Sequence, residues 1–221
     1  MGGWVLAGER GSAATFHARP VPSPAARTVT VVEVDRPALV LGSTQPEGVA
    51  DRAAVALAGA ELVRRASGGS AVLLEPGGPL WVDVVVPRDD PLWMDDVSRA
   101  FHWLGRAWAG ALTSLGAVAD VHEGPLRHSR WSPLVCFAGL GPGEVTIGGA
   151  KVVGVAQRRT RDGARFQCAL LRHWDPAPIL ALLALDPEER ARAAAELEGV
   201  AAGFDASPAT LVEAFVAHLP P

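Results

Sequence analysis

Two glycine-rich segments combine basic side chains with backbone that can approach an anion closely. The first, residues 64–72 (RRASGGSAV), holds two arginines, a hydroxyl and consecutive glycines between two expected strands. The second, residues 148–159 (GGAKVVGVAQRR), places Lys151 directly after a Gly-Gly turn, at the start of an expected strand. Backbone N–H groups beside positive charge bind carboxylates or phosphates and stabilise charge on a carbonyl oxygen. From the pattern alone, an ordinary strand connection with solvated arginines explains the first segment equally well.

Lys151 is the single lysine among 20 basic residues, the others being arginine. The chain is rich in Ala, Gly, Arg and Pro, a composition in which arginine replaces lysine wherever either residue serves. A compact ammonium that must reach a buried oxygen is not replaced by a planar guanidinium. The retained lysine therefore indicates a specific role, with survival by chance as the alternative.

Two cysteines, Cys136 and Cys168, are too few for a disulfide framework and lack metal-ligand spacing. Cys136 lies in the apolar run 134–138, which we expect to be a strand, fifteen residues before Lys151. A thiolate near an ammonium is favoured and can act as an acyl nucleophile. An inert cysteine buried in an apolar strand is the competing interpretation. Cys168, beyond an expected hairpin at Asp162, has a weaker claim to a role.

Taken together, these segments resemble the lipoate–protein ligase family, part of the biotin and lipoate ligase superfamily. The family loop Arg-Arg-x-Ser-Gly-Gly-Gly-Ala-Val is matched by residues 64–72, except that Ser70 replaces the third glycine. The family stretch Gly-x-Lys-Val-x-Gly-x-Ala-Gln-Arg-Arg is matched by residues 149–159 at every fixed position. A third, weaker match is residues 39–45 (LVLGSTQ), and the correspondence spans residues 36–172.

The resemblance implies an α+β fold, with a mostly antiparallel mixed sheet flanked by helices, like the catalytic domain of class II synthetases and biotin ligases. It implies that ATP and Mg²⁺ activate lipoate or octanoate as an acyl-adenylate. The acyl group then passes to a lysine of a lipoyl-carrier domain, of the 2-oxoacid dehydrogenase E2 or glycine cleavage H protein type. Lys151 would be catalytic, on the carbonyl and phosphate oxygens. The acyl and adenylate would be bound by Arg64, Arg65, Ser67, Gly68, Gly69, Ser70, Ala71, Val72, Gly149, Val152, Gly154 and Ala156.

The chain departs from the family pattern at two places. Residues 167–171 (QCALL) stand where the family has His-Gly-x-Leu-Leu, and Gly77-Gly78 stands where relatives have Gly-Asn. Both departures concern nucleotide handling and keep two alternatives open. One is an ATP-independent octanoyl or lipoyl transferase with Cys136 as the acyl nucleophile, by resemblance to ligase-like octanoyltransferases. The other is a non-catalytic family member that binds an acyl ligand.

Hydrophobic periodicity and turn residues predict the elements that must position these residues. We expect the opening residues 1–27 to be mixed and to end in a proline-rich loop. Residues 1–175 should form the catalytic domain, and residues 176–221 a helical extension packed on it, too short for the accessory domain of two-domain ligases. A separate accessory subunit therefore stays open as a partner. Strands are expected at 28–34, 38–42, 61–65, 71–74, 81–86 and within 134–171, and helices at 48–60, 95–115, 177–200 and 208–219.

Composition limits the class of protein. The chain has 221 residues, 49% of them hydrophobic, and a net charge of −4, which excludes global disorder and argues against nucleic-acid binding. No apolar run reaches the roughly 18 residues of a membrane span, and no secretory leader is apparent. We expect a soluble, cytoplasmic protein without a membrane partner.

Three further groups of polar residues have a structural and a functional interpretation. His122 and His128 form either a metal pair or solvated loop residues, and no metal site is expected. The acidic pairs 89–90 and 95–96 hold Mg²⁺ or serve as helix caps. A docking site for an acidic carrier domain, or a solvated hairpin edge, would be formed by Arg158, Arg159, Arg161 and Arg165.

Overall fold

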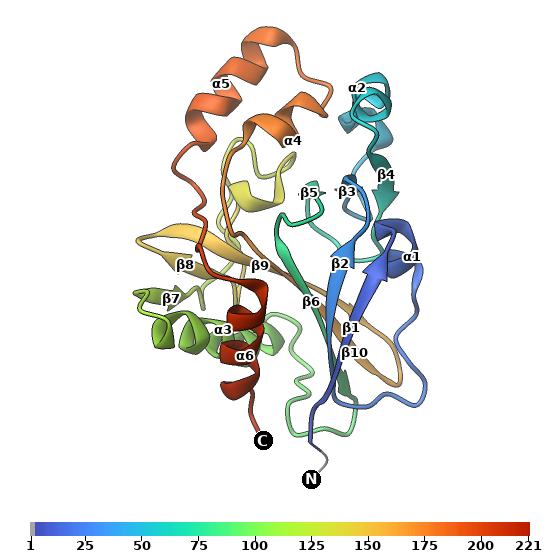
Figure 1. Ribbon diagram of the computed structural model, residues 1–221, viewed down its shortest axis with the longest axis vertical. Coiled ribbons are helices and arrows are strands. Elements are labelled where there is room, and N and C mark those ends of the chain that lie inside the picture. Colours follow the sequence, from blue (N-terminus) through green and yellow to red (C-terminus); the bar gives the residue numbers. More distant parts are fainter. Residues whose placement is uncertain (1–2) are drawn as a thin grey trace.

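The computed structural model describes residues 3–221 and is built on a seven-stranded sheet in the order β1-β2-β6-β10-β9-β8-β7 (Figure 1). Only β1 and β2 pair in parallel; every other neighbouring pair is antiparallel. The expected α+β class, with a mostly antiparallel mixed sheet, is confirmed. The strands of this sheet are β1 (Val5–Gly11), β2 (Thr28–Val34), β6 (Leu80–Pro87), β7 (Ala119–Val121), β8 (Val145–Ile147), β9 (Ala150–Arg159) and β10 (Gly163–Leu170).

A second, three-stranded sheet in the order β4-β3-β5 lies beside the first. It consists of β3 (Ala38–Leu41), β4 (Glu61–Arg64) and β5 (Val72–Leu74), and α2 (Arg52–Leu57) connects its first two strands. The short helix α1 (Ala13–Ala18) joins this sheet to the large one. Its Phe16 shares a buried cluster with Val40 of β3 and Trp81 of β6.

Helices α3 (His102–Ser114) and α6 (Pro208–Ala217) cover one face of the large sheet (Figure 1). Apolar residues at helical spacing on α3 form the inward side, and Trp108 stacks on Phe215 of α6 with ring centroids 4.0 Å apart. The remaining helices, α4 (Ala177–Ala181) and α5 (Pro187–Leu197), lie at the far end of the molecule, beyond the small sheet. Within the described part of the chain, no helix combines the length and apolar character needed to cross a membrane.

Alternation along β6 and β10 gives the large sheet two chemically different faces. Val84 and Phe166 point into the core under α3. Asp83, Arg165 and Gln167 are on the opposite face, toward the small sheet and α1, and Gln167 lies directly across from Asp83 in the strand register. The polar residues of this second face surround the inner end of the site described below.

The predicted elements are largely confirmed, with informative exceptions. The expected helix 177–200 is two helices, because Pro187 restarts the chain in α5 with Asp186 as its N-cap. The opening, expected to be mixed and to end in a proline-rich loop, contains β1 and α1, followed by residues 19–27 without helix or strand. The prediction of a strand at 134–138 is wrong. Only Val135 makes an isolated bridge, to Ala71, and the chain then turns through a 3₁₀ segment, Cys136–Ala138.

The C-terminal residues return to the catalytic half of the chain. The backbone of the segment 200–202 pairs with the first residue positions of β9: Lys151 N–H donates to Val200 O at 3.0 Å, and Ala202 N–H donates to Lys151 O at 2.9 Å. Near the two ends of the chain, the Trp4 indole N–H donates to Pro220 O at 2.9 Å.

Candidate active site

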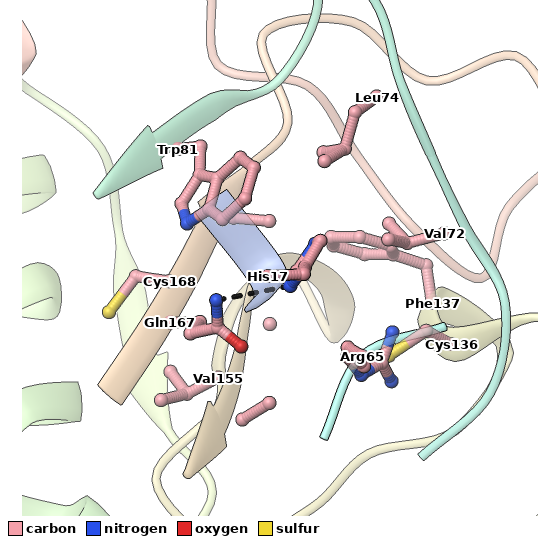
Figure 2. A pocket seen from close by; sticks show the side chains of 13 residues that line it. His17, Arg65, Val72, Leu74, Trp81, Cys136, Phe137, Val155, Gln167 and Cys168 are labelled. Carbon is pink, nitrogen blue, oxygen red and sulfur yellow. Dashed lines mark hydrogen bonds between the residues drawn. The ribbon is translucent and has the colours of Figure 1, made fainter. Parts of the chain in front are cut away.

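Two adjoining cavities lie between the two sheets, and they share four lining residues. The outer cavity has a volume of about 610 Å³, and the inner pocket, drawn in Figure 2, about 50 Å³. The outer cavity carries polar and charged residues, whereas the lining of the inner pocket is largely apolar. The residues that line both are Arg65, Cys136, Val155 and Ala156.

Cys136 lies where the two cavities meet. Its N–H donates to Ala71 O at 2.8 Å, which ties the start of the 3₁₀ segment to the glycine-rich loop. Phe137 and Ala138 are buried, whereas Cys136 is partly exposed. Cys168 differs: it is fully buried, and burial raises the pKa of its thiol to about 12. Of the two thiols, only Cys136 is therefore accessible as a nucleophile.

The Lys151 ammonium is buried beside this turn and its three hydrogens are matched by three acceptors. Nζ lies 3.0 Å from Cys136 O, 3.0 Å from Gly139 O and 2.7 Å from the Glu144 carboxylate. Nζ also lies 5.0 Å from the centre of the Phe137 ring. Lys151 therefore holds the turn that carries Cys136 through hydrogen bonds to its backbone. It also lines the outer cavity, and Glu144 balances its charge.

Glu144, which the sequence analysis did not select, completes this arrangement. It is buried, accepts from Gly141 N–H at 2.6 Å and from Val155 N–H at 3.3 Å, and pairs with Lys151. Gly154 leaves space for the Lys151 and Glu144 side chains, because a Cβ there would lie 3.3 Å from the Lys151 side chain and 3.6 Å from the Glu144 carboxylate. A carboxylate seven residues before a lone lysine is a weak signal, so only the fold identifies the pair.

The glycine-rich loop 67–70 borders the thiol. Gly69 has φ +96°, and a Cβ on it would lie 2.6 Å from the Arg65 guanidinium and 4.0 Å from the Cys136 Sγ. A side chain at this position would therefore fill the space beside the Cys136 thiol. The loop rests on the end of β3, since a Cβ on Gly42 would overlap Gly69 O. Gly68, Gly69 and Ser70 line the outer cavity.

The two arginines of the first motif have different roles. Arg65 is buried, donates from Nε and Nη2 to Gly68 O at 3.1 and 2.9 Å, and lines both cavities. Arg64 points elsewhere: its Nη1 donates to Gly42 O at 3.0 Å and to Gln45 O at 2.5 Å. Arg64 thus fastens the loop at residues 42–45, and only Arg65 reaches the cavities.

The third motif, residues 39–45, connects two segments of the chain through the side chain of Gln45. Gln45 is buried, accepts from Gly42 N–H at 3.0 Å and donates to Pro133 O at 2.8 Å. It therefore connects the end of β3 to the segment that leads into Cys136.

Ser67 and three other predicted binding residues do not line the two cavities. Ala71 and Val152 are buried in apolar clusters, and Gly149 forms the turn before β9 with φ +85°. Ser67 is buried and donates to Gln167 Oε1 at 3.5 Å. Of the remaining predicted residues, Val72 and Gly154 line the inner pocket and Ala156 lines both cavities.

The inner pocket contains polar residues from distant parts of the chain. His17 of α1 stacks on Trp81 with centroids 4.6 Å apart, and Gln167 Nε2 donates to His17 Nδ1 at 3.3 Å. Burial, with the positive charges of Arg65 and Arg165 in addition, lowers the pKa of His17 to about 3. Burial also raises the pKa of Asp83 to about 6, although Arg165 lies 3.1 Å from its carboxylate.

Asp90, Asp96 and His122 make structural contacts within the described chain, whereas the His128 side chain makes no hydrogen bond or ion pair there. Asp96 accepts from Ser98 N–H and Arg99 N–H, as the capping interpretation predicts, and Asp90 pairs with Arg27. His122 bonds to Pro125 O, and His128 lines the outer cavity. Among residues 3–221 no cluster of three or more His, Cys, Asp or Glu side chains is arranged to hold a metal ion.

The four arginines do not form one basic patch. Arg165 is buried against Asp83, and Arg159 lies over the Trp93 ring and donates to Asp95 O at 3.1 Å. Neither alternative, a docking site or a solvated hairpin edge, holds for all four arginines, because two of them are engaged within the fold.

Two curated proteins are similar in sequence to this chain. The octanoyltransferase LipM of Moorella thermoacetica is 34% identical over 125 residues, 56% of this chain and 45% of the relative. The octanoyltransferase LipM of Kyrpidia tusciae is 31% identical over 165 residues, 72% of this chain and 58% of the relative. The chain thus spans about half the length of the curated relatives it matches.

Solved structures share the fold. A bi-partite lipoate protein ligase from Thermoplasma acidophilum, studied with its E2 lipoyl domain, superposes with a TM-score of 0.77 at 21% identity, over 98% of this chain and 82% of the other. A lipoate-protein ligase A bound with ATP superposes with a TM-score of 0.68 at 20% identity. The match covers 98% of this chain and 83% of the other. The expected ligase-type catalytic fold is therefore confirmed. A family model for the lipoyl protein ligase A/B catalytic domain matches residues 15–204, and the chain belongs to this family.

Proposed function

We propose that this protein transfers an octanoyl or lipoyl group from a thioester donor to a lysine of a lipoyl-carrier domain, with Cys136 as the acyl nucleophile. The observation that carries the proposal is the place of Cys136 at the junction of a large cavity, which includes polar and charged side chains, and a small apolar pocket. An acyl chain in the inner pocket would put its carbonyl carbon at the thiol. The outer cavity would then hold the polar arm of a donor or acceptor.

The reaction would proceed in two balanced steps. The Cys136 thiolate attacks the donor carbonyl, a new C–S bond forms, and the donor thiolate leaves and takes up a proton. The amine of the acceptor lysine then attacks the acyl-Cys136 thioester. The C–N bond forms, the C–S bond to Cys136 breaks, and the amine gives up a proton as the thiolate is restored.

Within this proposal, Lys151 and Glu144 position the nucleophile. Lys151 fixes Cys136 O and Gly139 O, and Glu144 fixes Lys151 together with Gly141 N–H and Val155 N–H. A turn held at this many points keeps the thiol in one place relative to both cavities, which lowers the entropic cost of reaching the reactive geometry.

The ATP-dependent alternative uses the same cavities differently. In the ligase interpretation, ATP and Mg²⁺ convert the free acid into an acyl-adenylate, and Cys136 takes no part. We favour the transferase because both curated relatives are named octanoyltransferases and because the Lys151 charge is already balanced by Glu144. The third alternative, an acyl-binding protein without turnover, leaves the accessible thiol of Cys136 unexplained.

The test is a transfer assay without ATP. Purified protein is mixed with an octanoyl thioester of an acyl carrier protein and an unmodified lipoyl domain, and the octanoylated domain is measured by mass spectrometry. We expect product without nucleotide and a transient octanoyl adduct on the peptide that contains Cys136. Cys136→Ala should abolish both, whereas the matched change Cys168→Ala should leave transfer largely intact.

The same protein separates the alternatives. Pyrophosphate release that depends on octanoate or lipoate, together with full activity of Cys136→Ala, would contradict the transferase and establish the ligase. Binding of octanoate without turnover from either donor would establish the non-catalytic alternative.

A further inference from the structure

His17 brings an unusual polar group into the inner pocket. It comes from α1, far in sequence from the glycine-rich motifs, and it lines the pocket with Trp81 and Gln167. In Figure 2, Cys136 and Arg65 lie on one side of the pocket, Trp81 and Cys168 on the other, and His17 between them. An acyl chain that extends from Cys136 toward Trp81 therefore passes the imidazole.

The tautomer of His17 is set by its neighbours. Gln167 accepts a hydrogen bond from Ser67 Oγ at 3.5 Å through its amide oxygen, which leaves its amide nitrogen facing His17. That nitrogen donates to His17 Nδ1 at 3.3 Å, so Nδ1 is the acceptor and the ring proton is on Nε2. The low pKa of His17, about 3 because of burial, keeps the ring neutral at physiological pH.

The Nε2–H group has no partner. Nε2 is buried and makes no hydrogen bond with any described residue. In Figure 2 it lies on the side of the ring away from Gln167, facing Val72 and Phe137. A buried donor without an acceptor is unfavourable, so an acceptor supplied by a ligand would bind there with a gain.

We propose that the inner pocket prefers acyl groups that carry a hydrogen-bond acceptor along the chain over a plain saturated chain, and that His17 Nε2–H is the group that selects them. This inference rests on the proposed function, because it assigns the pocket to the acyl group. The acceptor is a sulfur, as in the dithiolane ring of a lipoyl group, or an oxygen, as in an oxo-acyl group. Both chemistries use the same donor, and the oxygen is the stronger acceptor.

The test measures binding without turnover. The affinities of octanoate, lipoate and 6-oxooctanoate are determined by calorimetry for the wild type and for His17→Phe, which keeps an aromatic ring against Trp81. We expect the wild type to bind 6-oxooctanoate roughly tenfold, and lipoate about threefold, more tightly than octanoate. His17→Phe should bind the three acids within about twofold of one another.

Two further variants keep the test decisive. His17→Gln retains a hydrogen-bond donor and should keep part of the preference for the acceptor-bearing acids. If His17→Phe does not fold, this variant still tests the role of the donor. Leu74→Ile changes the pocket wall without changing its polarity and should alter all three affinities by the same factor.

The outcomes distinguish this inference from the proposed function. If the acids bind without discrimination, or if His17→Phe still discriminates, the role of His17 is wrong while the acyl pocket stands. If none of the acids binds to folded protein, the assignment of the pocket to the acyl group fails, and the transfer assay decides separately whether the proposed function stands.

Discussion

The buried Lys151–Glu144 pair holds the turn that carries Cys136. All three ammonium hydrogens face acceptors of the protein, and both side chains are almost fully buried. The single lysine of an arginine-rich chain is thus explained by a site that a planar guanidinium does not fit. The retention of lysine follows from the shape of the site as well as from its charge.

This pair predicts a non-additive effect of mutation on stability. Lys151→Met leaves the Glu144 carboxylate buried without its cation, and we expect it to lower the free energy of unfolding by about 3–5 kcal/mol. Glu144→Gln should cost a similar amount, because its NH2 group would face the N–H or ammonium donors that the carboxylate accepts from, and Lys151 would lose its buried counter-charge. The double variant should recover part of the loss of the lysine variant, and urea denaturation measures all three. Additive losses would contradict the tight coupling of the pair.

His17 and Asp83 predict opposite dependences of stability on pH. The folded-state pKa of His17, about 3, lies below its ordinary value. Its contribution to the stability of the folded state is therefore complete above pH 6.5 and is lost as the pH falls. The folded-state pKa of Asp83, about 6, lies above its ordinary value, so its burial is tolerated at low pH and becomes costly as the pH rises through 4–6. Between pH 5 and 6 the two effects oppose each other.

Replacing His17 should reveal the effect of Asp83 on the pH dependence of stability. We expect the melting temperature of His17→Phe to rise as the pH is lowered from 7 to 5, whereas that of the wild type changes less or falls. Thermal unfolding at closely spaced pH values measures the difference. A parallel pH dependence in both proteins would mean that His17 titrates normally in the folded state.

At the level of elements, the fold brings residues of the two glycine-rich motifs together. Residues 64–72 and 149–159 are local patterns, and both bring residues to the same pair of cavities. The sequence predicted β2, β3 and α6 nearly to the residue. Glu144 and His17 were missed because their roles depend on long-range contacts: His17 meets Gln167, 150 positions away. The turn at Cys136 was missed because an apolar run between a proline and a glycine has the composition of a short strand.

The pairing of segment 200–202 with β9 predicts a link between the C-terminal part and the site. Ala202→Pro removes the N–H group that donates to Lys151 O at 2.9 Å and should loosen the start of β9. We expect transfer activity to fall severalfold. Phe215→Leu, in α6 against Trp108, is a control for destabilisation on the opposite side of the sheet and should retain activity at temperatures where it is folded. Equal activities of the two folded variants would contradict the link.

For the molecule as a whole, the mouth of the outer cavity is the place where a carrier protein would meet the site. Val97 and Leu126 line this cavity and are 55% and 52% exposed, although they are large apolar side chains. Exposed apolar residues at the rim of a polar cavity suit the methylene arm and the surrounding surface of a carrier domain. Leu57, on α2, is 90% exposed and lines neither cavity, so it provides a matched control.

Charge at this rim should therefore weaken carrier recognition and spare the chemistry at Cys136. We expect Val97→Glu and Leu126→Glu each to raise the KM for an octanoylated carrier protein by about tenfold, the effect of losing one well-packed interface side chain. Their rates with a small octanoyl thioester, which has no carrier surface, should stay within about twofold of wild type. Leu57→Glu should change neither value. A loss of rate with both donors would place the two residues at the reacting groups, and an unchanged KM would place carrier docking elsewhere on the molecule.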